Sequence, residues 1–245
     1  MQRVSVVVPA YNEEATILQV LDSLQVKVEN LAEILVVDDA STDGTAGLCR
    51  QYQSSHPVVR YFQLPCNCGK TAALAEGFRR STGEIVIVQD ADLEYDPADI
   101  NNVVQPIQHG EADVVYGSRF HAPHASQTFY LRSFLANLLL TFLSNLFTGM
   151  KLSDVETCYK AFRGEIIRGM RITSARFGFE IEVTAKLARL HSRVAEVPIS
   201  YNGRTYAEGK KIGIRDGLMA LWYILKYNLL VSKKDFFYPE GSFEP

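Results

Sequence analysis

The sequence predicts a single α/β domain with a mostly parallel central sheet flanked by helices. Short runs of β-branched residues alternate with helical segments along the first half of the chain, which is typical of a sheet covered on both faces. Each run is apolar throughout and is stopped by proline or by acidic residues, as expected for strands buried on both sides. The chain has 245 residues, of which 47% are hydrophobic, so one large core can form without disulfides.

The elements of this domain can be assigned in order along the chain. The first strand ends at Pro9, and the helix after it presents Ile17, Val20 and Leu24 on one face. Turn-forming residues around Gly44 lead into the second helix. Predicted strands cover residues 4–8, 34–37, 58–64, 85–88 and 114–116, and predicted helices follow at about 12–24, 45–53 and 69–80.

Two longer helices are predicted after residue 120, at residues 131–148 and about 214–231. In the first, polar residues recur every three or four positions and make a narrow polar stripe on a broad apolar cylinder. In the second, Leu218, Trp222 and Leu225 share an apolar face. Such helices either pack on the core or lie on a membrane surface, and the sequence leaves both open. No uninterrupted apolar stretch reaches about 20 residues, so no membrane-spanning helix is expected.

Acidic and polar residues follow three of the predicted strands. Residues 11–13 follow the first strand, 38–39 the second and 90–94 the fourth. Because ligands of parallel sheets bind at the carboxyl ends of the strands, these segments are expected to converge at one edge. Asp90 and Asp92, with Glu94 as a third carboxylate, predict a Mg²⁺ or Mn²⁺ site whose shell is completed by phosphates. The alternative is a solvated acidic turn that caps the next helix.

Two familiar motifs are excluded by their spacing. The segment beginning at Asp39 resembles a calcium loop, but the position that needs glutamate holds Arg50. The segment before Lys70 resembles a P-loop, but its required first glycine is replaced by Leu64. Asp39 is therefore expected to accept hydrogen bonds from a base or a ribose. Lys70 lies either near a diphosphate or in solvent.

The composition excludes several other classes of protein. A formal net charge of -3 lacks the basic excess of a nucleic-acid-binding protein. Cys66 and Cys68 form the only close cysteine pair and do not have zinc-site spacing. The four cysteines are therefore predicted to be reduced thiols in a cytosolic protein. No Gly-x-Ser-x-Gly motif supports a hydrolase.

Several motifs together resemble the family-two glycosyltransferases, which have a GT-A fold. They are Val7-Val8-Pro9-Ala10-Tyr11-Asn12-Glu13, Val36-Val37-Asp38-Asp39-x-Ser41-x-Asp43-Gly44, Asp90-Ala91-Asp92 and Gly117-Ser118-Arg119. A later segment, Asp154 to Arg163, is similar to the branch that includes dolichyl-phosphate mannosyltransferase and bacterial polyprenyl-phosphate sugar transferases. The resemblance covers most of residues 3–231.

The resemblance implies a role for each matching residue. The nucleotide sugar would be bound by Pro9, Tyr11, Glu13, Val37, Asp39, Lys70, Asp90 and Ala91. The metal would be held by Asp90, Asp92 and Glu94, the last standing where the mannosyltransferase branch often has glutamine. The donor or acceptor phosphate would be bound by Arg119, Arg132, Arg204 and Lys211. The catalytic residues would be Asp92, Arg119 and Asp154, with Asp154 as general base if the acceptor were a hydroxyl.

The implied function is the transfer of a hexose, either mannose or glucose, to a dolichyl-like polyprenyl phosphate. The donor would be GDP-mannose or UDP-glucose. The reaction would depend on a metal and would invert the configuration of the sugar. Residues 1–120 would bind nucleotide sugar and metal, and residues 121–245 would bind the acceptor, within a single structural domain. The protein is expected to be cytoplasmic and to lie peripherally at the cytoplasmic face of the membrane. It would bind there either to the membrane surface or to a membrane partner protein. The alternatives are a transferase that extends a saccharide through a hydroxyl acceptor, and a non-catalytic nucleotide-sugar-binding protein.

Overall fold

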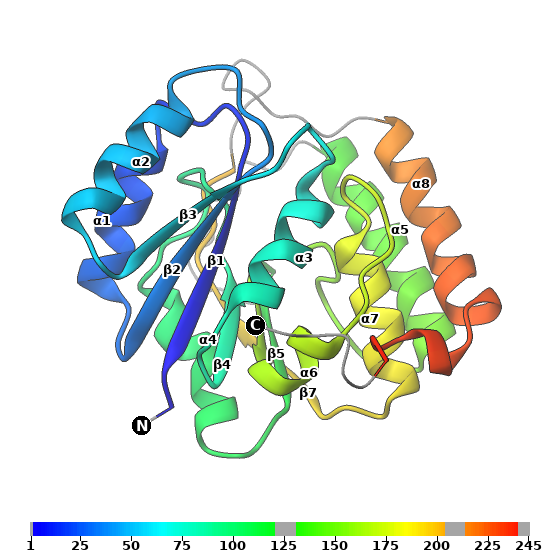
Figure 1. Ribbon diagram of the computed structural model, residues 1–245. Helices are drawn as coiled ribbons and strands as arrows, with labels where there is room; N and C mark the ends of the chain where they lie inside the picture. Colours follow the sequence, from blue (N-terminus) through cyan, green and yellow to red (C-terminus); the bar gives the residue numbers. More distant parts are fainter. Residues whose placement is uncertain (1, 121–130, 204–213, 240–245) are drawn as a thin grey trace.

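The strands form one seven-stranded sheet (Figure 1). The structure is a computed structural model, and it describes residues 2–120, 131–203 and 214–239. Side chains are described for residues 2–120, 134–203 and 215–239. The sheet order is β3-β2-β1-β4-β6-β5-β7. The strands are β1 (Val4–Ala10), β2 (Leu31–Asp38), β3 (Val59–Gln63), β4 (Ile85–Val88), β5 (Val114–Ser118), β6 (Lys160–Arg163) and β7 (Val194–Pro198).

Helices cover the sheet and form a separate layer beside it (Figure 1). α3 packs on β1 and β2, α4 packs on the strands from β4 to β7, and α5, α7 and α8 contact one another. The helices are α1 (Ile17–Lys27), α2 (Thr45–Ser55), α3 (Lys70–Arg80), α4 (Asp99–Gln108), α5 (Leu131–Thr148), α6 (Gly164–Gly169), α7 (Phe179–Arg189) and α8 (Ile214–Leu225). A π-helical turn, Lys226–Leu230, continues α8, and a 3₁₀ turn spans Lys233–Asp235.

The parallel half of the sheet contains the first four predicted strands, and its burial explains their apolar sequence. β1 lies between β2 and β4, is parallel to both, and is buried along its whole length. Its register places Pro9 beside Val37 and Ala10 beside Asp38. The polar segments that follow these strands therefore emerge at one edge of the sheet, as parallel strands require.

Two strands, β6 and β7, were missing from the sequence prediction. β6 is antiparallel to both of its neighbours, with Val86 opposite Phe162 on one side and Val115 opposite Ala161 on the other. It has four residues, and Lys160 and Arg163 at its ends interrupt any apolar run. β7 lies at the edge of the sheet and is only partly buried, so its residues need not be apolar. The sheet is nonetheless mostly parallel, as predicted.

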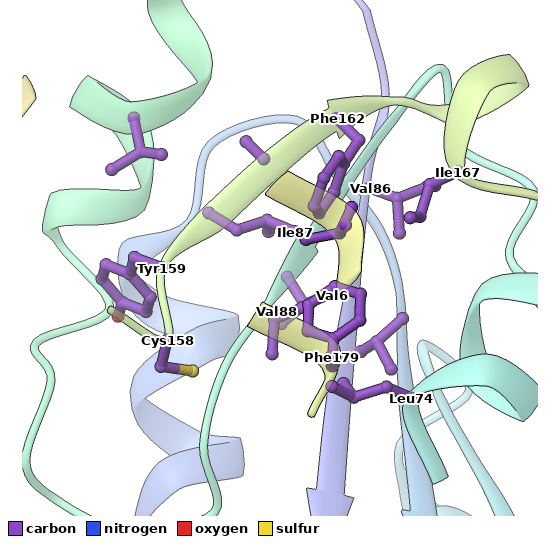
Figure 2. Packing of buried hydrophobic residues seen from close by; sticks show 14 of the residues in the cluster. Val6, Leu74, Val86, Ile87, Val88, Cys158, Tyr159, Phe162, Ile167 and Phe179 are labelled. Carbon is purple, nitrogen blue, oxygen red and sulfur yellow. The ribbon is translucent and has the colours of Figure 1, made fainter. Parts of the chain in front are cut away.

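A central group of apolar side chains joins the sheet to α3 and α7 (Figure 2). Val6 and Val88 contribute from the sheet, and Leu74 contributes from α3. Phe162 of β6 and Phe179 of α7 have ring centroids 6.2 Å apart in an edge-on arrangement, and both are fully buried. β6 thus ties the C-terminal helices to the parallel half of the sheet.

Both long helices leave large apolar residues exposed, and α5 turns its polar stripe inward. On α5 the polar stripe contains Asn137, Thr141 and Ser144, which are all buried, whereas Phe142 and Leu146 are more than 60% exposed. On α8 the buried face is formed by Ala220, Tyr223 and Ile224, and the exposed face carries Leu218, Trp222 and Leu225. Within the described residues, no helix has the length and apolar character needed to cross a membrane.

Substitution Phe162→Ala tests the role of β6 in the core. We expect the free energy of unfolding to fall by about 3–5 kcal/mol, because the change leaves a cavity between the sheet and α7. Urea denaturation measures this loss, and Phe142→Ala, on the exposed face of α5, is the matched control with a small expected effect. Equal effects of the two substitutions would contradict the assigned role.

Candidate active site

The ends of β1 and β2 are joined by hydrogen bonds between the segments that follow them. The backbone N–H of Asn12 donates to Ser41 Oγ at 2.9 Å, and the N–H of Glu13 donates to Thr45 Oγ1 at 2.9 Å. Asn12 has a φ of 54°, a left-handed conformation that asparagine tolerates better than most residues. These contacts place residues 11–13 beside the loop after β2, as the sequence predicted.

The two aspartates that end β2 have different partners. Asp38 accepts hydrogen bonds from Ser41 and from the Tyr61 hydroxyl, so it fixes the local structure. Asp39 accepts the N–H groups of Cys68 at 2.7 Å and Gly69 at 2.8 Å. Burial raises the pKa of Asp39, and these two N–H donors lower it in part. Asp39 therefore links the end of β2 to the loop that precedes α3.

The acidic segment after β4 lies beside the same edge of the sheet. Thr16 Oγ1 donates to the Ala91 carbonyl at 2.8 Å, which joins this segment to the start of α1, the helix that follows β1. Asp92 is 6% exposed, and its Oδ1 accepts the N–H of Glu94 at 3.0 Å. The predicted convergence of three strand ends is confirmed in the structure.

Asp90 is paired with Lys70, the first residue of α3. Lys70 Nζ lies 2.8 Å from Asp90 Oδ1 and 3.3 Å from Glu180 Oε1 of α7. Burial alone would lower the pKa of Lys70, but the nearby negative charges, Asp90 foremost, hold this pKa well above its usual value. Lys70 is therefore a largely buried cation paired with the acidic cluster, and not the solvated lysine of the alternative interpretation.

The environment of Asp90 and Asp92 suits a hard divalent cation. Both carboxylates follow one buried strand, and Asp90 already forms an ion pair with the positively charged ammonium group of Lys70. Oxygen ligands of this kind are those that Mg²⁺ and Mn²⁺ prefer. Among the described residues, however, no group of three or more histidine, cysteine or acidic side chains is arranged to hold a metal ion. Glu94 accepts a hydrogen bond from the Tyr201 hydroxyl at 2.9 Å, so its role as third ligand stays a prediction.

A second charged group lies where β5 ends. Arg119 Nε and Nη2 lie 2.7 and 2.8 Å from the two carboxylate oxygens of Asp154, in a bidentate pair. Asn137 of α5 donates to the same carboxylate at 2.9 Å. Asp154 is fully buried, which by itself raises its pKa, but Arg119 and Asn137 bring the pKa below its usual value. Asp154 therefore remains ionised and orients the Arg119 guanidinium.

The other predicted phosphate-binding residues fall where the structure gives no side chains. Arg204 and Lys211 lie outside the described residues. Arg132 lies in the first turn of α5, in the part of that helix without described side chains.

Tyr201 and Glu180 are site residues that the sequence analysis missed. Tyr201 follows β7, donates to Glu94, and lies under the Arg119 guanidinium, which is 5.0 Å from the centre of its ring. Glu180 lies in the first turn of α7 and contacts Lys70. Both are brought to the site by elements far along the chain from residues 90–119, so no local spacing pattern indicated them.

The sequence matches a known protein family over most of its length. Residues 5–170 match the model of glycosyl transferase family 2. The chain belongs to this family. The family, the enzyme class and the GT-A fold predicted from the sequence are thereby confirmed.

The names of several relatives describe sugar transferases of undecaprenyl, dolichol or dolichyl phosphate. The chain is 28% identical to the undecaprenyl-phosphate mannosyltransferase of Micrococcus luteus, over 93% of this chain and 99% of the relative. It is 26% identical to the dolichol-phosphate mannosyltransferase of Pyrococcus furiosus and 32% identical to a dolichyl-phosphate beta-glucosyltransferase of Trichomonas vaginalis. These matches cover 92% and 80% of this chain, and 64% and 63% of the two relatives.

Solved structures agree on the fold. Glucosyl-3-phosphoglycerate synthase from Mycobacterium tuberculosis, in complex with Mn²⁺, uridine diphosphate and phosphoglyceric acid, superposes with a TM-score of 0.71. The match covers 94% of this chain and 80% of the synthase, at 21% identity. At this identity the likeness establishes the shared architecture alone.

The pH dependence of stability tests the Arg119–Asp154 pair. A carboxyl whose pKa is lowered on folding stabilises the protein above its unfolded pKa, and this contribution is lost as the pH falls through its folded pKa. We therefore expect Asp154→Asn to cost about 3–5 kcal/mol at pH 7 and progressively less below about pH 4.

Urea denaturation across that pH range measures the cost. The matched control is Asp96→Asn, which removes an exposed pair with Lys27 and should cost at most about 1 kcal/mol. A cost for Asp154→Asn that does not change with pH would show that the charge of Asp154 is not what stabilises the pair.

Proposed function

We propose that this chain transfers a hexose from a nucleotide diphosphate sugar to a polyprenyl phosphate at a membrane surface. One observation supports this assignment above the others: α5 contacts the Arg119–Asp154 pair with its polar face and turns its apolar face outward. The same helix thus joins a buried guanidinium, suited to phosphate, to a surface suited to a lipid chain. The names of the M. luteus, P. furiosus and T. vaginalis relatives agree with this assignment.

The donor is assigned to the edge of the sheet where β1, β2 and β4 end. Pro9, Tyr11, Glu13, Val37 and Asp39 would contact the base and ribose, and Ala91 would contact the nucleotide. Asp90 and Asp92, with Glu94, would hold Mg²⁺ or Mn²⁺, which supplies charge stabilisation to the departing diphosphate when bound. The M. tuberculosis synthase was crystallised with Mn²⁺ and UDP, which supports a divalent metal here. GDP-mannose and UDP-glucose are both retained as donors, since the relatives include mannosyl and glucosyl transferases.

Lys70 adds a fixed positive charge to the donor site. Its ammonium lies within 3.3 Å of both Asp90 and Glu180 and is held by the start of α3. A buried ammonium at this position attracts the diphosphate and stabilises the negative charge that develops on it as the sugar leaves. Glu180 keeps Lys70 in place by binding it from α7.

The acceptor phosphate is assigned to Arg119, with Arg132, Arg204 and Lys211 as further contacts. A phosphate oxygen is already anionic near neutral pH, so it can attack the sugar without a general base. This agrees with the geometry of Asp154, whose carboxylate is occupied by Arg119 and Asn137. We therefore assign Asp154 to positioning Arg119 rather than to proton transfer.

The exposed apolar face of α5 and α8, called here the apolar surface, is assigned to the lipid bilayer. It includes Leu135, Leu138, Leu139, Phe142, Leu146, Phe147, Leu218, Met219, Trp222 and Leu225, and is continued by Leu229 and Leu230 of the π-helical turn. α5 and α8 contact each other, so their exposed residues belong to adjacent elements (green and orange in Figure 1). Lys233 and Lys234, which are exposed just after the π-helical turn, are assigned to anionic headgroups. A lipid acceptor requires such a surface, because its chain does not leave the membrane.

Asp92→Asn tests the enzymatic part of the proposal. We expect loss of at least about 100-fold in turnover, because a carboxylate that holds the cation at the diphosphate is removed. The assay follows radiolabelled sugar from GDP-mannose or UDP-glucose into the organic phase with polyprenyl phosphate, and Asp96→Asn is the control of unchanged activity.

Other outcomes of this assay would overturn the proposal. Retained activity of Asp92→Asn at saturating metal would contradict the metal role. Label that enters only water-soluble saccharides would favour the hydroxyl-acceptor alternative, and no transfer from any donor would favour a non-catalytic binding protein.

Leu225→Asp and Phe142→Asp test the membrane part. We expect each to weaken binding to anionic liposomes by about tenfold or more, because a buried leucine or phenylalanine contributes roughly 1.5–3 kcal/mol. Flotation of the full chain measures this binding. Val26→Asp is the matched control, because Val26 is 85% exposed but lies on α1, away from the apolar surface.

Two results would contradict the bilayer assignment. One is negligible binding of the unaltered chain to liposomes. The other is self-association of the unaltered chain in ultracentrifugation that is abolished by both aspartate substitutions. This result would assign the apolar surface to contact with a second copy of the chain.

A further inference from the structure

Two exposed thiols, Cys66 and Cys68, lie next to each other in the loop between β3 and α3. Their Sγ atoms are 3.2 Å apart, and both residues are exposed. The other two cysteines, Cys49 and Cys158, are buried. Cysteines two positions apart have Cα atoms at most about 7 Å apart, which is near the upper end of the range that a disulfide spans.

The loop that carries these thiols is anchored on both sides. Before it, the N–H of Leu64 donates to the Asp38 carbonyl at 2.8 Å. After it, the N–H of Thr71 donates to the Arg176 carbonyl at 2.9 Å, and Gly69 packs so closely that an added Cβ would lie 2.7 Å from Arg176 Cα. A change between Cys66 and Cys68 is therefore absorbed by residues 65–68 rather than by the start of α3.

The peptide group of Cys68 connects this loop to the proposed donor site. Its N–H donates to Asp39 Oδ1 at 2.7 Å, and the next N–H, of Gly69, donates to Asp39 Oδ2 at 2.8 Å. A bond between the two sulfurs closes a small ring that contains the Asn67–Cys68 peptide. Such a ring restricts the backbone angles of Asn67 and Cys68, which set the direction of the Cys68 N–H.

We propose that Cys66 and Cys68 form a reversible disulfide that breaks the contact between the Cys68 N–H and Asp39 and thereby weakens nucleotide binding. Hydrogen peroxide is the oxidant: one thiolate attacks a peroxide oxygen, the O–O bond breaks, and a sulfenic acid and hydroxide form. The hydroxide takes up the proton that the thiol lost and becomes water. The second thiol attacks that sulfur, the S–O bond breaks, and a second water leaves as the disulfide forms. A dithiol reductant restores both thiols by exchange. The effect on nucleotide binding rests on the proposed function, whereas the disulfide and the altered loop do not.

The rate of oxidation has an expected pH dependence. The hydrogen bond that the Cys68 thiol donates to Cys66, with smaller contributions from burial and from the nearby negative charges, raises the pKa of Cys68 above its usual value. Because the thiolate is the attacking species, the disulfide forms faster as the pH rises through the alkaline range.

The first experiment follows the disulfide and the loop without any nucleotide. The full chain is treated with hydrogen peroxide or with dithiothreitol, and mass spectrometry locates the bond. We expect a Cys66–Cys68 disulfide, together with faster hydrogen–deuterium exchange at the Cys68 and Gly69 amides. Cys66→Ser is the control, in which peroxide should leave this exchange unchanged. Absence of the disulfide, or a disulfide with unchanged exchange, overturns the proposal.

The second experiment measures the affinity for UDP and for GDP with Mn²⁺ by calorimetry. We expect oxidation to weaken the binding of the better nucleotide by roughly tenfold in the unaltered chain, since Asp39 loses an N–H donor that holds its carboxylate in place. Reduction should restore the affinity, and Cys66→Ser should bind equally well in both states. Unchanged affinity after oxidation overturns the link to nucleotide binding. If the reduced chain binds neither nucleotide, the proposed nucleotide-sugar donor is contradicted instead. The hydrogen–deuterium exchange measurement then decides by itself whether the disulfide alters the loop.

Discussion

The buried pair of Arg119 and Asp154 is the interaction on which the arrangement of this protein depends most. Removing both charges from water is costly, and the cost is recovered only by bidentate geometry and further hydrogen bonds to the carboxylate. Asn137 supplies one of those bonds from α5. The pair thus requires the polar stripe of α5 to face inward. Once it does, the broad apolar face of that helix has to face outward.

A second buried network holds the donor side of the site together. Lys70 from α3 meets Asp90 from the end of β4 and Glu180 from α7. The network extends toward Glu156, where burial and the nearby Glu180 raise the pKa to about 7. Lys160, on β6, lies among the same carboxylates, and burial lowers its pKa. The C-terminal elements therefore do more than cover the sheet, because they position the charges that face the acidic segment after β4.

β6 makes both networks possible. It pairs antiparallel with β4 and β5, so the chain from Asp154 to Tyr159 runs alongside the ends of these parallel strands. Phe162 at the same time packs against Phe179, at the start of the helix that carries Glu180. A short strand with charged ends thus links core packing to the placement of Asp154 and Glu180.

The sequence by itself determined the parallel half of the fold and the edge where the site lies. Continuous β-branched runs form strands that are buried on both faces. A polar segment that follows such a strand has to emerge at the carboxyl end of that strand. Residues 11–13, 38–39 and 90–94 therefore converge as predicted. The motifs also sufficed to recognise the family. Only the tertiary structure decided where β6 and β7 pair, because short strands with polar or half-buried residues carry little periodic signal. It alone brought Tyr201 and Glu180 to the site, since contacts between distant segments leave no spacing pattern. It also decided the orientation of α5: amphipathicity defines two faces, but the Arg119–Asp154 pair selects which one points inward.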